Sequence, residues 1–416
     1  MIKIAFVDSW SVGFGIVEPL IKELRVNENY ELLFVHYDSL HKKYPDKLVL
    51  SNLNGAPEKL KKSQLIEGVD FSKYNYSAKT FYEIESPDLL VFISIHNLEQ
   101  RYFLNIAKKF NIPSILVMHG VILKDKIIKK KRIVDKLYYP FTKINRLRYY
   151  RSLFKFFVND VKSLKLENNT AKYYQLLFKI IFKREEYVNR ISEFDSFKVN
   201  TICTISDTDE DFYRKLYNQT PENTKYKLVG HMDLHKLSRY YKDNKNQIPK
   251  ETNEVVFFSQ PYVGEGVISA KDYIQSLNVI NKTCNDLGLK FIVRPHPRDD
   301  MSFISKIKDD YNMILSNRSL EEDLIRSVCV IGINSTVLLT ANLIEKNIII
   351  LDFGFSEDFS LAENERIKVV GFREIKVIKE ALSSLNLSES KSKKLNLQDP
   401  VKLIKEEIDL LVNDFK

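Results

Sequence analysis

The sequence predicts an α/β protein in which two doubly wound domains face a cleft. Short apolar runs with the character of buried strands alternate with segments of helical periodicity in the first third of the chain, and again after residue 253. Such alternation is typical of βαβ units and a parallel sheet. A length of 416 residues suits two domains of ordinary size. The polar stretch at 242–253 is the expected linker.

The first domain is expected to span residues 1–245. We expect strands at 2–7, 31–36, 88–94, 115–118, 201–205 and 225–229, and helices at 16–25, 98–110 and 208–217. Residues 121–198 depart from this pattern, because long segments rich in Lys, Tyr and Phe carry apolar residues at helical spacing. We therefore expect a basic, helical insertion after the strand at 115–118.

The second domain is expected to span residues 253–390 and to repeat the alternation. We expect strands at 254–258, 289–293, 328–333 and, as the last one, 348–352, with helices at 270–287 and 302–310. An amphipathic helix over 395–416 is expected to end the chain.

Composition indicates a folded globular protein, since 44% of residues are hydrophobic and 29% are charged. No apolar run reaches the ~18 residues needed to span a bilayer, and the N-terminus lacks a cleavable signal, so a cytoplasmic location is expected. Three scattered cysteines are typical of reduced core residues. Neither they nor the histidines have metal-ligand spacing, so we expect no metal and no cofactor.

Positive charge is concentrated in the expected insertion. The net charge is +9, and residues 121–151 contain eleven Lys/Arg against two Asp. Such a segment can contact anionic lipid or nucleic acid, or form a solvated helical face. Its aromatic residues recur at helical spacing, which is more typical of a core than of base stacking. We therefore expect an anionic membrane surface as the partner of 121–151, on the inner membrane, and no nucleic acid.

Two segments of the second domain combine groups that bind phosphate. Arg294, His296 and Pro297 follow one buried strand, and Ser335 and Thr336 follow another and begin a helix. In open α/β sheets, ligands bind at the carboxyl ends of the strands. Hydroxyls and N–H groups at a helix N-terminus bind anions, and Arg adds charge-assisted bonds. The sequence therefore predicts a phosphate pocket for a nucleotide-activated donor.

The first strand of the second domain also ends in polar residues. Ser259 and Gln260 follow it directly, and Gly264, Glu265 and Gly266 form an acidic, glycine-containing loop just beyond. This loop could hold the donor sugar, or it could be only a turn. Ser259 and Gln260 are expected to join the nucleotide pocket.

Three acids lie between the two phosphate-binding segments. A carboxylate of Glu321, Glu322 or Asp323 could accept hydrogen bonds from ribose hydroxyls, as in dinucleotide folds. The same residues could be ordinary first-turn acids of a helix capped by Ser319. Both readings stay open, with Glu321 preferred for ribose.

The first domain offers two candidates for general base. His119, followed by Gly120, ends a strand, and a histidine suits proton transfer near neutral pH. Asp8 ends the first strand and could act on the acceptor side. The fragment Gly13-Phe14-Gly15 lacks the third glycine of a dinucleotide fingerprint, so a nicotinamide cofactor is not indicated.

Three segments of the second domain together resemble segments of bacterial sialyltransferases and polysialyltransferases that use CMP-sugars: Phe257–Pro261, Val293–Arg298 and Asn334–Thr336. Those enzymes have the two-Rossmann (GT-B) fold. Met118–Gly120 and Leu228–His231 resemble strand ends of capsule Kdo transferases and teichoic-acid glycerophosphotransferases. The resemblance implies that His296, Ser335 and Thr336 contact the CMP phosphate and that Glu321 or Glu322 contacts ribose. The acid pair that supplies the base in sialyltransferases has no clear counterpart here.

The resemblance implies a metal-independent glycosyltransferase of surface-polysaccharide synthesis, in capsule or lipooligosaccharide. It would move a nonulosonic acid, such as sialic acid or Kdo, from CMP to a glycan or lipid-linked acceptor. Two alternatives keep the architecture: a transferase that uses CDP-glycerol or a UDP-sugar, and a nucleotide-sugar epimerase.

Overall fold

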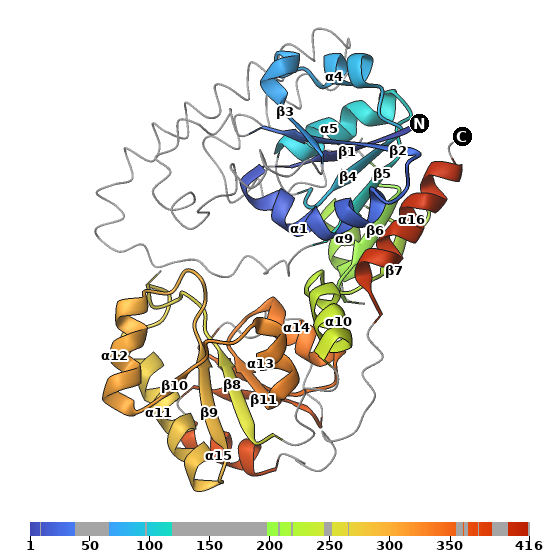
Figure 1. The fold of residues 1–416 in the computed structure, drawn as a ribbon. Helices are drawn as coiled ribbons and strands as arrows, with labels where there is room; N and C mark the ends of the chain where they lie inside the picture. The colour runs from blue at the N-terminus through green and yellow to red at the C-terminus, as the bar shows by residue number, and fades with distance from the viewer. Residues whose placement is uncertain are drawn as a thin grey trace, which may run out of the picture. The chain divides into compact units, whose positions relative to one another are not determined.

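The computed structural model describes residues 1–8, 10–37, 66–95, 98–118, 198–206, 209–217, 219–244, 252–264, 266–354, 361, 365–372, 374–384 and 398–414. They form two compact units, each built on one parallel sheet (Figure 1). The described residues up to Val229 and from Pro400 onward make the first unit, and those between Gly230 and Asp399 make the second. Two Rossmann-like α/β units are thus confirmed. The predicted insertion at 121–198 lies, except for its last residue, outside the described residues.

The sheet of the first unit has the strand order β3-β2-β1-β4-β5-β6-β7, with all neighbours parallel. Its strands are β1 (Ile2–Val7), β2 (Tyr30–His36), β3 (Glu67–Asp70), β4 (Leu89–Phe92), β5 (Ser114–Val117), β6 (Thr201–Thr204) and β7 (Lys225–Leu228). Its helices are α1 (Trp10–Leu24), the 3-10 turn η1 (Phe71–Tyr74), α4 (Ala78–Glu85), α5 (Leu98–Lys109), α9 (Asp209–Tyr217) and α16 (Pro400–Asp414).

The sheet of the second unit has the order β10-β9-β8-β11-β12-β13. Its strands are β8 (Glu254–Phe258), β9 (Lys290–Arg294), β10 (Ile314–Leu315), β11 (Ser327–Gly332), β12 (Asn347–Asp352) and β13 (Ile367–Gly371). Its helices are α10 (Asp233–Asn244), α11 (Ala270–Asp286), α12 (Met301–Tyr311), α13 (Leu320–Arg326), α14 (Thr336–Leu343) and α15 (Ile375–Ser383). Counted along the chain, this is the Rossmann order 3-2-1-4-5-6, so the strand order reverses between β8 and β11.

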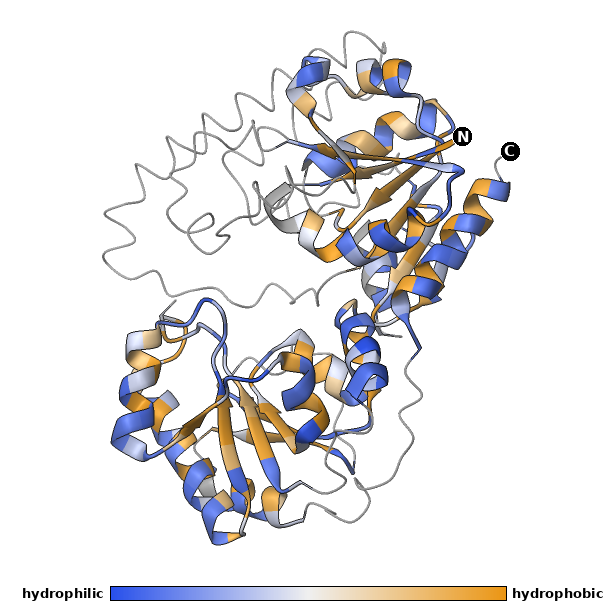
Figure 2. Cartoon of the chain, viewed as in Figure 1, coloured by the Kyte–Doolittle hydropathy of each residue, from blue (hydrophilic) through white to orange (hydrophobic). Residues whose placement is uncertain are grey.

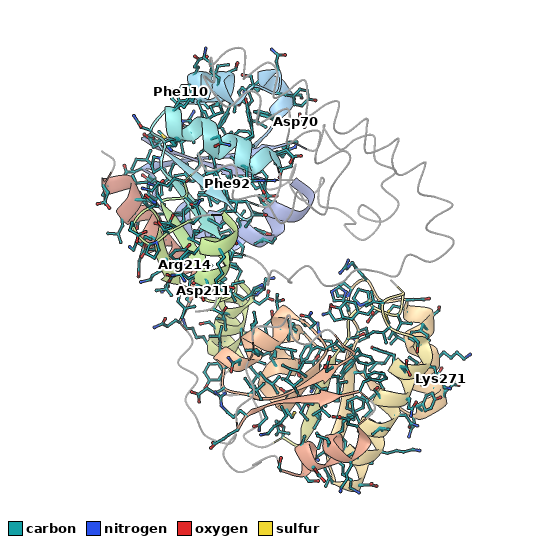
Figure 3. The ribbon with its side chains drawn as sticks, turned by 180° about the vertical axis from the view of Figure 1, so that it is seen from behind. Asp70, Phe92, Phe110, Asp211, Arg214 and Lys271 are labelled. Carbon is teal, nitrogen blue, oxygen red and sulfur yellow. The ribbon has the colours of Figure 1, made fainter. Side chains whose placement is uncertain are left out.

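Burial explains why the strands read as continuous apolar runs. Every residue of β4, β5, β8 and β11 is buried, because helices cover both faces of a parallel sheet. Figure 2 shows the strands as mainly hydrophobic and the helices as mixed. The side chains in Figure 3 show the same division: Phe92 at the end of β4 is fully buried, whereas Asp211 and Arg214 form an exposed ion pair of 2.7 Å on α9.

Helix α1 begins at Trp10, so the predicted helix start at residue 16 was wrong. Gly13 lies in this earlier part of the helix and lets it approach the end of β1 closely. A Cβ atom at Gly13 would lie 2.7 Å from both Asp8 Cβ and Ile93 Cδ1. The glycine therefore serves close helix–strand packing rather than a turn.

Several elements of the structure were not predicted. Strand β3 was missed because its sequence, EGVD, has no apolar run, and it forms through pairing with β2. The prediction that 348–352 is the last strand was also wrong, since β13 pairs with β12 beyond it. Helix α10 packs on α13, so the units divide between Val229 and Gly230 rather than at the expected boundary of 245.

Helix α16 returns to the first unit and packs against α1. Ile404 and Ile408 are fully buried, and Glu407, only 3% exposed, accepts a hydrogen bond of 2.6 Å from Lys225 of β7. The helix is therefore an integral part of the first unit.

Ile404→Ala is expected to destabilise the first unit by about 2–5 kcal/mol, the usual effect of removing a buried aliphatic side chain. Leu410→Ala is the matched control, because Leu410 lies on the same helix and is 51% exposed. Its effect should stay within about 0.5 kcal/mol. Chemical denaturation measures both, and equal midpoints would contradict the packing of α16.

The three cysteines are free and buried. Burial raises the pKa of each thiol above its ordinary value, and that of Cys284 to about 12. Because the thiolate is the reactive form, we expect none of Cys203, Cys284 and Cys329 to react with a thiol reagent at pH 8 in the native protein. All three should react after denaturation, and rapid labelling of the native protein would contradict this burial.

Candidate functional site

The carboxyl ends of β8, β9 and β11 bring several predicted site residues to one edge of the second sheet. Phe258 pairs with Arg294 on one side and with Gly332 on the other, so the loops that follow begin at the same level. The Ser259 N–H donates to the Arg294 carbonyl at 3.0 Å, which ties two of these loops together. This edge is the place where the strand order reverses, and it is where doubly wound sheets bind ligands.

His296 lies in a tight turn directly after β9. Its backbone N–H donates to Asp299 Oδ2 at 2.7 Å, and the Arg298 N–H donates to His296 Nδ1 at 3.1 Å. Because Nδ1 accepts this bond, it carries no proton, and the neutral ring holds its proton on Nε2. The turn, in which Pro297 is exposed, therefore fixes His296 as a hydrogen-bond donor through Nε2.

Ser335 caps α14, and Thr336 is the first residue of that helix. The Ser335 Oγ accepts the Val337 N–H at 3.3 Å, and the side chain is only 7% exposed. The first N–H groups of a helix and its dipole together attract anions. Asn334, 8% exposed, precedes the cap, and its Nδ2 has no hydrogen-bond partner among the described residues. Asn334 was not among the predicted site residues, since a single amide carries no spacing signal.

Arg294 is held by a buried acid. Its Nη1 donates to Asp323 Oδ2 at 2.8 Å and to the Arg318 carbonyl at 2.7 Å. Asp323 is fully buried, and it also accepts hydrogen bonds from Ser316 Oγ at 2.6 Å and Arg318 Nε at 2.9 Å. The charge of Arg294 is therefore largely offset, and the residue is fixed between β9 and α13.

The same network reaches the start of β8. Glu254 accepts hydrogen bonds from Arg318 at 2.7 Å and from Arg326 at 3.1 Å. Burial acts to raise the pKa of Glu254, but the hydrogen bonds and charges of the two arginines outweigh it, so the pKa is lowered. Alternating charges thus join α13 to the sheet.

The other two acids of α13 lie in its first turn. Ser319 caps the helix by accepting the Glu322 N–H at 3.1 Å, and Glu322 lies 3.9 Å from Arg326. Glu321 and Glu322 are partly exposed, whereas Asp323 is the structural acid of the three. Ribose binding by Glu321 or Glu322 stays a prediction.

The loop after β8 is a compact turn. Gly266 has a positive φ of 70°, and its N–H donates to the Val263 carbonyl at 3.0 Å, while Glu265 lies outside the described residues. Gln260 and Gly264 line a pocket of about 240 Å³ beside this turn. Ser259, 3% exposed, shares a hydrogen bond of 2.7 Å with the Tyr273 hydroxyl at the same pocket.

Of the two candidate bases, only Asp8 is described. It is 7% exposed at the end of β1, and it accepts a hydrogen bond of 2.8 Å from Gln100 Nε2 of α5. His119 and Gly120 follow β5 but lie outside the described residues. The identity of the base therefore stays a prediction.

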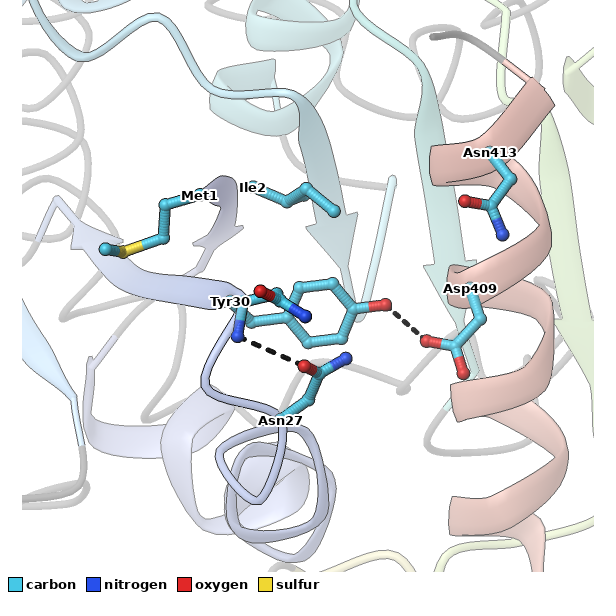
Figure 4. A pocket seen from close by; sticks show the side chains of 7 residues that line it. Met1, Ile2, Asn27, Tyr30, Asp409 and Asn413 are labelled. Atoms are coloured by element: carbon cyan, nitrogen blue, oxygen red, sulfur yellow. Dashed lines mark hydrogen bonds between the residues drawn. The ribbon is translucent and has the colours of Figure 1, made fainter.

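A larger pocket, of about 500 Å³, lies at the amino ends of β1 and β2 (Figure 4). There the Tyr30 hydroxyl donates to Asp409 of α16, and burial together with this bond raises the pKa of Tyr30 above its usual value. Asn27, Asn29 and Asn413 complete the polar lining. Because ligands of doubly wound sheets bind at the opposite, carboxyl edge, this pocket is not part of the candidate site.

The part of the chain that the structure describes contains no group of three His, Cys, Asp or Glu side chains that could hold a metal ion. Within the same residues, no helix combines the length and the apolar character that crossing a bilayer requires.

Solved structures show the same fold. The UDP-GlcNAc 2-epimerase from Methanocaldococcus jannaschii has a TM-score of 0.54 at 11% identity, over 98% of this chain and 100% of that one. The UDP-GlcNAc 2-epimerase from Neisseria meningitidis bound to UDP-GlcNAc has a TM-score of 0.53 at 12% identity, over 98% of this chain and 100% of that one. The wall teichoic acid polymerase TagF has a TM-score of 0.51 at 13% identity, over 99% of this chain and 89% of that one. At these identities the likeness establishes the GT-B architecture alone.

No curated protein sequence matches the chain significantly. The family model for the alpha-2,8-polysialyltransferases (POLYST) matches residues 50–351. This is well over half of the chain, and it includes β8, β9 and β11 with the loops that follow them. The chain therefore belongs to the alpha-2,8-polysialyltransferase family and is a glycosyltransferase of the GT-B fold.

Proposed function

We propose that this glycosyltransferase moves a nonulosonic acid, such as sialic acid or Kdo, from a CMP-activated donor to a glycan acceptor of a surface polysaccharide. The observation that carries the proposal is that β8, β9 and β11 end side by side at one edge of the second sheet. The loops that contain Ser259, His296 and Ser335 begin at the same level of the sheet. Membership of the polysialyltransferase family supports the same donor class.

In this proposal the second unit binds and activates the leaving group. The N-terminus of α14, with Ser335 and Thr336, binds the CMP phosphate. His296 donates from Nε2 to a phosphate oxygen, and charge that builds on the leaving phosphate is stabilised by these fixed donors. Arg294 acts as a positioning residue, since Asp323 holds its guanidinium. Either Glu321 or Glu322 accepts hydrogen bonds from ribose.

We propose that the acceptor hydroxyl is deprotonated in the first unit by His119 or Asp8. Single His119→Ala and Asp8→Asn variants separate these two candidates, since only loss of the base removes the fall of kcat at low pH, where the base is protonated. Residues 121–151 are proposed to bind anionic lipid at the inner membrane, with each Lys or Arg near the surface worth about 1 kcal/mol. Unchanged liposome binding after removal of these charges would contradict that part.

The test is a transfer assay with CMP-sialic acid, CMP-Kdo, CDP-glycerol and UDP-GlcNAc, each with and without a glycan acceptor. Acceptor-dependent release of CMP, retained in EDTA, supports the proposal. Acceptor-dependent turnover of CDP-glycerol or UDP-GlcNAc would show that the donor belongs to that class and is not a CMP-sugar. Conversion of a UDP-sugar without acceptor would identify an epimerase instead.

A further inference from the structure

The pocket beside the His296 turn has the size and the walls for one heterocyclic ring. Its volume is about 240 Å³. Sites for whole drug-sized ligands measure about 300–1,000 Å³, so this pocket suits one part of a nucleotide. Val263, Ile304 and the rings of Tyr273 and Phe303 form its apolar lining. The two ring centroids lie 6.2 Å apart, and the Tyr273 hydroxyl is already bonded to Ser259.

Two polar side chains in this lining have unused hydrogen-bonding capacity. Asp299 accepts the His296 N–H through Oδ2 at 2.7 Å, and its own N–H donates to the His296 carbonyl at 2.9 Å. Within the described part of the chain, Asp299 Oδ1 and the side-chain amide of Gln260 have no hydrogen-bond partner. The pocket is thus joined directly to the turn that holds the proposed phosphate-binding histidine.

We infer that this pocket recognises the 4-aminopyrimidine ring of a cytosine nucleotide and that Asp299 reads its amino group. The inference rests on the proposed function and names the part of the donor that sets its specificity. An ionised carboxylate only accepts hydrogen bonds. Cytosine has a donor, N4–H₂, where uracil has the acceptor O4. Asp299 therefore bonds to cytosine and repels uracil, while the Gln260 amide donates to N3 or O2 of the ring.

A carboxylate in this position also explains why the base, and not the phosphate, occupies the pocket. Asp299 and its neighbour Asp300 would repel a phosphate group. The phosphate instead meets the N-terminus of α14 and His296, which carry donors.

Asp299→Asn tests this assignment. The Asn Oδ1 can still accept the His296 N–H, so the turn is kept, whereas the Asn Nδ2 now presents a donor to the base. Calorimetry measures the Kd values of CMP, UMP and ribose 5-phosphate for the natural protein, Asp299→Asn and the control Asp300→Asn. Asp300 lines the same pocket, but its carboxylate caps α12 by accepting from Ser302 at 2.9 Å.

We expect the natural protein to favour CMP over UMP by about tenfold or more, the usual discrimination of a paired base contact. In Asp299→Asn the preference for CMP over UMP should disappear or turn into a preference for UMP, and the affinity for ribose 5-phosphate should stay unchanged. Asp300→Asn should keep the ratio. Gln260→Leu, which leaves the His296 turn untouched, should weaken CMP several-fold but not ribose 5-phosphate.

An unchanged CMP/UMP ratio in Asp299→Asn would overturn the inference. Equal weakening of all three ligands would also overturn it, because Asp299 would then act only through the His296 turn. Failure of the proposed function is a different result: the natural protein would not bind CMP, or CMP binding would not depend on His296.

Discussion

His296→Ala is expected to lower kcat for transfer from a CMP-sugar by about 10²–10³-fold, the usual effect of removing one donor that stabilises developing charge. The turn after β9 holds this histidine with its proton on Nε2, because Nδ1 accepts the Arg298 N–H at 3.1 Å. The Ala variant loses that donor. KM should change less than kcat if the bond strengthens in the transition state.

His296→Gln is the informative partner variant, because its amide N–H₂ can restore a donor near the position of Nε2. It should recover part of the lost kcat. Both variants should keep the circular dichroism and the midpoint of unfolding of the natural protein. A value of kcat for His296→Ala within a few-fold of the natural protein would show that His296 only shapes the loop.

Asp323→Ala is expected to cause the largest loss of stability, about 3–5 kcal/mol. Asp323 is fully buried and neutralises Arg294 and Arg318, with N–O distances of 2.8 and 2.9 Å. Its removal leaves the partly buried Arg294 guanidinium without its anion and Arg318 with Glu254 alone, and it also removes the acceptor of Ser316 Oγ. Chemical denaturation of the second unit measures the change.

Asp310→Ala is the matched control, since Asp310 is an exposed acid on α12 of the same unit. Its effect should stay within about 0.5 kcal/mol. Equal stabilities of the two variants would mean that the Asp323 network contributes little, and Arg294 would then be available for direct phosphate binding rather than positioning.

The sequence was sufficient for β8, β9, β11 and β12 of the second unit, where apolar runs are continuous and bounded by polar residues. The strand predicted at 254–258 has those bounds, and the one predicted at 289–293 lies within one residue of β9. Strand β3 and helix α10 could not be predicted in their places, because the first depends on pairing with β2 and the second on packing against α13. Tertiary contacts decided both elements.

The candidate site was predictable in outline for a topological reason. Carboxyl ends of parallel strands meet at one edge, so His296 and Ser335 could be expected together without a structure. The partner of Arg294 could not, because Asp323 lies 29 positions away and meets it only when α13 docks on the sheet. Asp299 was missed for the same reason, because only the folded second unit places its carboxylate in one pocket with the rings of Tyr273 and Phe303.

We propose that the β8/β11 edge of the second unit binds CMP, and thermal unfolding with a nucleotide panel tests this binding most directly. The panel is CMP, CDP, UMP, UDP and GDP, with the natural protein and His296→Ala. A ligand at 100 times its Kd adds about 2.7 kcal/mol of stability. We predict stabilisation of the natural protein by CMP, weaker effects of the other nucleotides, and loss of the CMP effect in His296→Ala. No stabilisation by any nucleotide, or an equal CMP effect in the variant, would contradict it.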